Sequence, residues 1–439
     1  MFQRNRLALL ACITFLLGSI WRCFYLIHLH PPTSFILLSD VQMYMDYAKI
    51  WADPLKKEGI DQILKSPGAF MMLGWLYKQT LNWTLAVWVQ LGMALLVPVW
   101  IALTAWELYS PAVAALALIL AALYFPFIDE ASYFMSEGYF LFWMTLTFWL
   151  LLRALKTGGP WQGIVAVLAG LSAAITAATR SVILLPLLCV ACFLAMVAWK
   201  GRGHQTQTED GADSIPALLP RRFAVLCAGV LLGMAVIMIP LAMRCTRLNS
   251  GKPCVISIDG AFNLFMGRHE GVRSVHFHDL ERGLYFIWGN PAWSQKGFWD
   301  EAHYNMGLYD TNKLYQAAWD KVRKAPGQAF LISLEHVFDL FNGLPWPANA
   351  TPIRPWVVLY QELYWVFILG PALYYLIRQR HKLFPTTAEG FAVWLLMLPL
   401  LGIMLAAFIT QGETRYRIPF DAFTLIVAAR AYSGLLSQQ

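Results

Sequence analysis

Long apolar runs alternate with short polar connections along most of the chain. A membrane-spanning helix needs about 20 mostly apolar residues. Ten runs approach this length, and they cover residues 7–27, 84–107, 111–128, 138–153, 161–179, 181–199, 223–243, 355–377, 387–409 and 417–435. The pattern predicts an all-α polytopic membrane protein, built as a bundle of about ten transmembrane helices.

Two long polar segments interrupt this pattern, at about 28–83 and 244–354. The first has helical patterning with breaks, which favours interfacial helices. The second is long enough for a small lobe. We therefore expect three parts: an N-terminal transmembrane module, 1–243, that includes the loop 28–83; a loop region, 244–354; and C-terminal transmembrane helices, 355–439.

Composition agrees with a lipid environment. Hydrophobic residues make up 58% of the chain and charged residues only 13%, where a soluble domain has about 25% charged residues. The net charge of +7 is typical of a nucleic-acid-binding protein if the chain is soluble. In a membrane protein, the meaning of this net charge depends on which side of the membrane each charged residue lies.

Basic residues orient the helices, because lysine and arginine concentrate in cytoplasmic connections. Twelve of them fall in one set of short connections, whereas the opposite set holds only Arg180, Arg415 and Arg417. This asymmetry predicts cytoplasmic termini and places both long segments on the extracytoplasmic side. We therefore expect an integral membrane protein.

Ionisable side chains gather beside the apolar runs on the predicted outer side. The carboxylates Asp40 and Glu137 occur there with the cations Lys65, Arg180 and Arg415. Charges near the hydrocarbon layer are costly and therefore mark functional sites by default. The alternative is a set of interfacial helix caps and mutual ion pairs. The cations suit a lipid-linked phosphate, and a carboxylate suits the activation of an acceptor hydroxyl.

Six motifs occur in order along the chain: SDVQMYMDYAKIW, LKSPGAFMMLGWLYK, ALYFPFIDEASYFMSEGYFLFW, GLSAAITAATRSVILLPL, SIDGAFNLFMGRHEG and RYRIPFDAFTLIVAA. Together they resemble the GT-C superfamily of membrane glycosyltransferases. They are most similar to bacterial members of glycosyltransferase family 39, which is related to protein O-mannosyltransferases and lipid A aminoarabinose transferases. The resemblance covers nearly the whole chain. It implies a GT-C-like bundle with two long extracytoplasmic segments in a bacterial inner (plasma) membrane.

The resemblance also implies roles for individual residues. Asp40 corresponds to the first-loop acid that activates the acceptor for attack on the anomeric carbon with inversion. Lys65 corresponds to the lysine that contacts the donor phosphate, and Arg180, Arg415 and Arg417 are expected to add positive charge there. Further pocket residues are expected to be Tyr44, Glu137, Asn263 and Arg268.

Other features of the sequence leave alternatives open. No metal ligand is assigned and the cofactor is unknown, so a divalent metal stays possible. Cys245 and Cys254 are nine residues apart on the outer side, where an oxidising environment allows a disulfide.

The leading hypothesis is that the protein is an enzyme that transfers a sugar from a polyprenyl-phosphate donor to a lipid, glycan or protein acceptor at the extracytoplasmic face. Its other expected partners are membrane lipids, and no nucleic acid is expected to bind. One alternative is a glycan polymerase or ligase with a pyrophosphate donor, for which His276, His278 and His303 are candidates. A lipid-phosphate transporter or flippase and a scaffold without chemistry are the others. The sugar and the acceptor stay undetermined.

Overall fold

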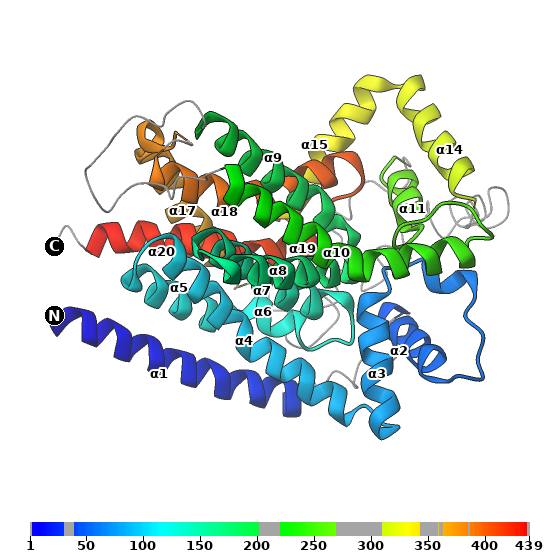
Figure 1. The fold of residues 1–439 in the computed structure, drawn as a ribbon, viewed down its shortest axis with the longest axis horizontal. Helices are drawn as coiled ribbons and strands as arrows, with labels where there is room; N and C mark the ends of the chain where they lie inside the picture. Colours follow the sequence, from blue (N-terminus) through cyan, green and yellow to red (C-terminus); the bar gives the residue numbers. More distant parts are fainter. Residues whose placement is uncertain are drawn as a thin grey trace.

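The computed structural model describes residues 2–29, 39–201, 220–268, 310–342, 359, 363–384 and 387–436. These residues form an all-α bundle (Figure 1). Its first half comprises α1 (Phe2–Phe24), η1 (Tyr25–Leu29), α2 (Ser39–Ala52), η3 (Ile60–Ile63), α3 (Gly68–Thr80), α4 (Thr84–Leu108), α5 (Pro111–Leu123), α6 (Phe125–Glu130), α7 (Ser136–Lys156), α8 (Pro160–Thr179), η4 (Ser181–Ile183) and α9 (Leu184–Gly201). The second half comprises α10 (Pro220–Leu248), α11 (Asp259–Met266), α14 (Thr311–Lys324), α15 (Pro326–Asn342), η9 (Trp365–Leu369), α17 (Gly370–Arg378), η10 (Arg380–Lys382), α18 (Ala388–Ile409), α19 (Thr414–Arg417), η11 (Ile418–Phe420) and α20 (Asp421–Leu436).

Seven of the described helices are long and apolar enough to cross a membrane. They correspond to seven of the ten predicted runs, which confirms a polytopic all-α protein. The predicted run 111–128 is shorter, because Tyr124 is extended and Pro126 lies in the first turn of a separate helix, α6. The runs 355–377 and 417–435 contain the shorter helices η9–α17 and α20, and part of the former lies outside the described residues.

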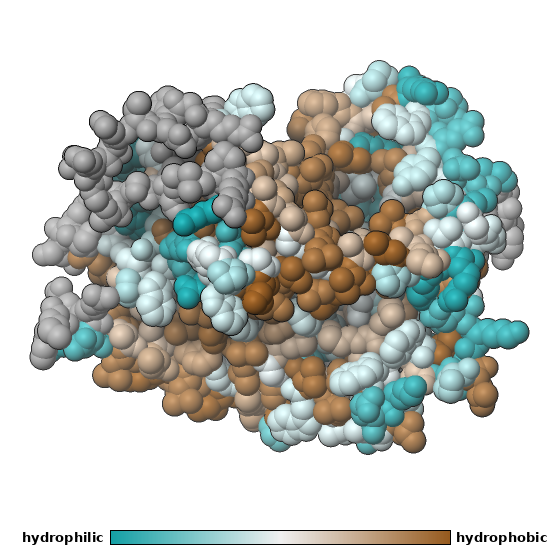
Figure 2. Space-filling view, viewed as in Figure 1, coloured by the Kyte–Doolittle hydropathy of each residue, from teal (hydrophilic) through white to brown (hydrophobic). Residues whose placement is uncertain are grey.

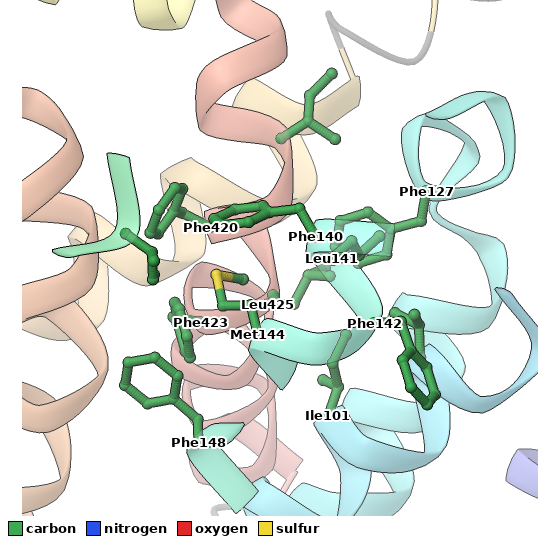
Figure 3. Packing of buried hydrophobic residues seen from close by; sticks show 14 of the residues in the cluster. Ile101, Phe127, Phe140, Leu141, Phe142, Met144, Phe148, Phe420, Phe423 and Leu425 are labelled. Carbon is green, nitrogen blue, oxygen red and sulfur yellow. The ribbon is translucent and has the colours of Figure 1, made fainter. Parts of the chain in front are cut away.

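Helix α7 forms the centre of the bundle. Its apolar window is 67% buried, whereas that of α1 is only 17% buried. Aromatic side chains from α7 pack against η11 and α20 (Figure 3): Phe140 lies 5.8 Å from Phe420, and Phe148 lies 4.4 Å from Phe423, between ring centroids. Helix α7 therefore holds its first turn in a fixed place relative to the C-terminal helices.

Helices α8 and α10 approach closely through small residues. A side chain at Gly170 would clash with the backbone of Val230, and one at Gly233 would clash with Val167. Gly229 and Gly233 are four residues apart, which is the spacing of a glycine packing face in membrane helices. This contact fixes the end of α8, where Arg180 follows.

The two ends of the bundle differ in character. Both termini lie at one end, and α2, α3, α11 and α14 lie at the other (Figure 1). Hydrophobic side chains cover the middle of the face shown in Figure 2, and hydrophilic ones gather over the end with α11 and α14. The segment 28–83, predicted to be helical with interruptions, contains α2, η3 and α3 at this end.

A disulfide ties two connections together at the end opposite the termini. Cys245 in α10 pairs with Cys254 in the connection to α11, and both pack against Ile63 and Ile258. The Ile258 amide also donates a hydrogen bond to the Ile63 carbonyl at 2.8 Å. The beginning of α11 is thereby held beside the residues that precede α3.

Candidate active site

A cavity of about 100 Å³ lies at the end of the bundle opposite the termini. Residues from α2, α7, α11, α18 and α19, and from the connections before α3 and after α8, line it together. Its lining comprises Asp40, Tyr44, Lys65, Ser66, Met135, Ser136, Glu137, Thr179, Arg180, Ser181, Val182, Asp259, Asn263, Ile403, Ala406, Ala407, Thr410, Gln411, Arg415 and Tyr416. The cavity therefore brings together segments from nearly the whole length of the chain.

The carboxylates of this cavity share one structural origin. Asp40, Glu137 and Asp259 each lie in the first turn of a helix, in α2, α7 and α11 respectively. A negative charge is favourable at this position because the helix dipole is positive at its N-terminus. The cations Lys65 and Arg180 come from connections, and Arg415 comes from the single turn α19. Helix ends thus meet at one polar centre.

Glu137 and Arg180 form the tightest ion pair in the lining. The Arg180 Nη1 atom lies 2.5 Å from Glu137 Oε1 and 3.4 Å from the Ser136 hydroxyl. Burial acts to lower the pKa of Arg180, but the Glu137 carboxylate raises it, and the net pKa lies above the ordinary value. The guanidinium carbon also lies 4.8 Å from the centre of the Tyr416 ring. Arg180 is therefore a fixed and permanently charged part of the wall.

Arg415 is shared among three carboxylates. Its nitrogens lie 2.5 Å from Glu413, 3.4 Å from Asp40 and 3.9 Å from Glu137. Its guanidinium packs against the Tyr416 ring at 5.3 Å. The Asp40 side chain keeps 28% of its surface exposed. Asp40 is thus accessible from the cavity and lies beside a cation.

Lys65 has a looser ion pair. Its Nζ atom lies 3.8 Å from Asp259 Oδ1, which exceeds the usual hydrogen-bond length of about 2.7–3.2 Å. The Asp259 carboxylate raises the pKa of Lys65. Lys65 is therefore charged, and its ammonium group has room to accept a second anionic partner in the cavity.

The remaining predicted pocket residues in this lining, Tyr44 and Asn263, are neutral, and they lie beside the neutral Gln411 and Tyr416. Gln411 Nε2 donates to the Tyr416 hydroxyl at 2.8 Å and to Asn263 Oδ1 at 3.4 Å. Tyr44 is buried, and burial raises its pKa to about 12, so its hydroxyl keeps its proton near neutral pH. These groups offer hydrogen bonds to an uncharged ligand such as a sugar.

Two predicted residues lie elsewhere. Arg417 is 0% exposed and pairs with Asp421 at 3.1 Å, with its guanidinium 3.9 Å from the centre of the Tyr364 ring. Arg268 donates to the carbonyls of Ala329, Phe408 and Ile409 and to the Ser333 hydroxyl. Neither arginine lines this cavity, contrary to the expected phosphate contact of Arg417 and the expected pocket position of Arg268; the charge of Arg417 is paired with Asp421, and Arg268 lies outside the lining with neutral partners.

Several lining residues were not predicted from the sequence. Asp259, Gln411, Tyr416 and Ser136 line the cavity, and Glu413 contacts Arg415 from the adjacent turn. The position of Asp259 at a helix start gives the same local signal as Asp40. Nothing local indicates Gln411, which follows an apolar helix. In the part of the chain that the structure describes, no group of three or more His, Cys, Asp or Glu residues forms a metal-binding cluster.

Comparison with known proteins agrees with this architecture. Residues 66–243 match the family model described as dolichyl-phosphate-mannose-protein mannosyltransferase, a segment that includes Glu137 and Arg180 but neither Asp40 nor Arg415. No curated protein matches the chain by sequence.

Three solved structures of Archaeoglobus fulgidus oligosaccharyltransferase are similar to this fold. An apo form matches with a TM-score of 0.56 and 13% identity over 98% of this chain and 51% of that one. AglB in complex with an inhibitory peptide and a dolichol-phosphate matches with a TM-score of 0.53 and 13% identity over 98% of this chain and 50% of that one. A form tethered with an acceptor peptide that contains the NVT sequon matches with a TM-score of 0.53 and 14% identity over 98% of this chain and 50% of that one. The chain thus spans about half the length of these relatives, and the GT-C-like fold and resemblance predicted from the sequence are confirmed.

Proposed function

We propose that this protein transfers a sugar from a polyprenyl-phosphate donor to an acceptor at the extracytoplasmic membrane face. The observation that carries this proposal is the cavity in which the accessible carboxylate Asp40 lies among Lys65, Arg180 and Arg415. Two matches support the same class of donor: the mannosyltransferase family model, and the fold shared with an oligosaccharyltransferase whose structure was solved in complex with a dolichol-phosphate.

The geometry supports a single displacement. Asp40 takes the proton from the acceptor nucleophile as the nucleophile attacks the anomeric carbon from the face opposite the phosphate. The bond from the anomeric carbon to the phosphate oxygen breaks, and polyprenyl phosphate leaves with one more negative charge. The configuration at the anomeric carbon is inverted. Fixed cations that meet this developing charge supply a large part of such catalysis, and Lys65 is the cation with the loosest existing pair.

The pairing of Arg415 suggests how the base becomes active. Arg415 contacts Asp40 Oδ2 at 3.4 Å, so the guanidinium engages this oxygen and competes with an acceptor hydroxyl for it. A donor phosphate competes for the same guanidinium. Binding of the donor therefore draws Arg415 from Asp40 and leaves this carboxylate available to the acceptor.

The position of the disulfide supports an extracytoplasmic site. Disulfides persist in oxidising compartments and are rare in the cytosol. The Cys245–Cys254 bridge lies at the end of the bundle with the cavity, and both termini lie at the opposite end. A membrane-impermeant maleimide should label these two cysteines in intact cells only after treatment with a reductant. A Cys245→Ser/Cys254→Ser variant is the control, because any labelling of this variant comes from the other cysteines.

A pyrophosphate-linked donor is the main alternative. The histidines on which that hypothesis depends, His276, His278 and His303, lie outside the described residues. Movement of a lipid phosphate across the membrane without cleavage is the second alternative. It requires charged residues deep within the spans, whereas the cavity and its cations lie at one end.

The test uses the purified protein in lipid nanodiscs. Polyprenyl-phosphate mannose and other polyprenyl-phosphate sugars are compared with pyrophosphate-linked donors, and lipid, glycan and peptide acceptors are added in turn. We expect release of polyprenyl phosphate and a product whose anomeric configuration, read by NMR, is opposite to that of the donor. Turnover of pyrophosphate donors alone, or retention of configuration, would refute the proposal. Transport without cleavage in sealed vesicles would assign the protein to the flippases.

A further inference from the structure

A second cavity, of about 320 Å³, lies among α11, α14, α15 and α18. Its lining is almost wholly apolar and includes Leu264, Trp319, Val322, Phe330 and Phe408. An apolar cavity of about 150 Å³ is enough to hold a benzene-sized ligand, so this one has room for several carbon atoms of an alkyl chain. Such a cavity left empty is unfavourable, because its walls lose contacts.

This cavity is separate from the candidate active site but shares two walls with it. Asn263 lines the first cavity and its neighbour Leu264 lines the second. At the end of α18, Thr410 lines the first and Ile409 lines the second. The helix α11 and the last turn of α18 therefore divide a polar cavity from an apolar one.

The apolar cavity opens beside an exposed apolar row on α15. Helix α15 exposes a row of large apolar side chains at Phe330, Leu331, Leu334 and Phe338. Phe330 is both 55% exposed and part of the cavity lining, so the cavity continues into this exposed row. The cavity can therefore be entered by a hydrocarbon chain from this exposed face.

Positive charge lies at the wall of this cavity. Arg268 is buried. Its guanidinium donates to three carbonyls and a hydroxyl, and its Nε atom has no hydrogen-bond partner among the described residues. It forms no ion pair in the part of the chain that the structure describes. A small adjoining hollow is lined by Arg268 and Lys321 together, and the exposed Arg323 and Lys324 follow in the last turn of α14. This part of the surface favours an anionic headgroup.

We propose that the second cavity binds one acyl chain of an anionic phospholipid, with the headgroup against Arg268 and the basic last turn of α14. The apolar lining takes the chain, and the lysines and arginines take the phosphate. The donor lipid is a less suitable occupant, because its phosphate is expected at Lys65 on the other side of the wall formed by α11 and α18. The lipid site does not depend on the proposed transfer reaction.

Photo-crosslinking at two adjacent positions tests this site. A benzophenone amino acid replaces either Phe330, which lines the cavity, or Leu331, which is 61% exposed on the same helix and is not in the lining. The full-length protein is placed in nanodiscs with equal amounts of phosphatidylglycerol and phosphatidylcholine, and crosslinked lipids are identified by mass spectrometry. We expect the ratio of phosphatidylglycerol to phosphatidylcholine at position 330 to exceed that at position 331 by at least about threefold, because the basic residues beside the cavity attract an anionic headgroup.

Two kinds of variant separate the chain from the headgroup. Ala329→Phe fills the cavity and should reduce the ratio at position 330 to that at position 331; Val322→Phe replaces it if the first variant does not fold, as judged by size-exclusion chromatography. Arg323→Gln/Lys324→Gln should lower the preference for phosphatidylglycerol while crosslinking to lipid at position 330 continues. Equal ratios at the two positions would overturn the proposal. Preferential crosslinking of added polyprenyl phosphate at position 330 would also overturn it, because the cavity would then belong to the donor.

Discussion

Replacement of Asp40 by Asn separates catalysis from folding. Among the described residues, Asp40 makes one polar side-chain contact, at 3.4 Å to Arg415, and its side chain is 28% exposed. Partly exposed ion pairs of this kind contribute up to about 1 kcal/mol to stability. A general base contributes roughly 10²–10⁴-fold to a rate, or about 2.7–5.4 kcal/mol of activation free energy. Asp40→Asn should therefore reduce the rate of transfer far more than it reduces stability.

The assay measures the initial rate of polyprenyl-phosphate release at saturating donor and acceptor in nanodiscs, together with the thermal midpoint of unfolding. Asp46→Asn is the matched control, because Asp46 lies on the same helix, accepts a hydrogen bond from Gln42 at 2.7 Å and does not line the cavity. We expect the control to retain a rate close to that of the wild type. A rate for Asp40→Asn within threefold of the wild type would refute the assignment of the base. A rate loss matched by a large fall in the midpoint would show a structural role instead.

Three further predictions concern donor binding, a buried ion pair and pH. Lys65→Ala should raise the KM for the donor roughly 10–150-fold, since a hydrogen bond to a charged group contributes about 1.5–3 kcal/mol, whereas Lys78→Ala, on the exposed side of α3, should leave it unchanged. Arg417→Leu should lower the free energy of unfolding by about 3–5 kcal/mol, because it leaves the buried carboxylate of Asp421 unpaired. Adding Asp421→Leu should restore part of this loss. A further, additive loss of stability in the double variant, measured by thermal unfolding in detergent, would contradict this prediction. Burial raises the pKa of Asp129 to about 7, above its unfolded value of 3.8, so between these two pH values the unfolded state releases the proton first. The free energy of unfolding of the wild type should therefore fall relative to that of Asp129→Asn as the pH rises from about 4 to about 7. A difference in melting temperature between the two proteins that does not change with pH would refute this.

The sequence predicted much of the site because charges beside apolar runs are few. Asp40, Lys65, Arg180 and Arg415 occur next to predicted spans, where an ionisable group is costly without a partner or a function. The structure places all four on one cavity. Apolar runs and the distribution of lysine and arginine are local features of the chain, so the all-α membrane architecture also followed from the sequence.

Only the tertiary structure distinguished the two arginines of the motif RYR. Arg415 and Arg417 are two residues apart, and successive residues of a helix are rotated by about 100°, so their side chains point in nearly opposite directions. One faces the cavity and the other faces Asp421. Lys65 and Asp259 meet across a long separation in sequence, because the disulfide and the Ile63–Ile258 contact hold their connections together. Local patterns of hydropathy determine which residues leave water, but the partner that each buried charge finds depends on how distant helices pack.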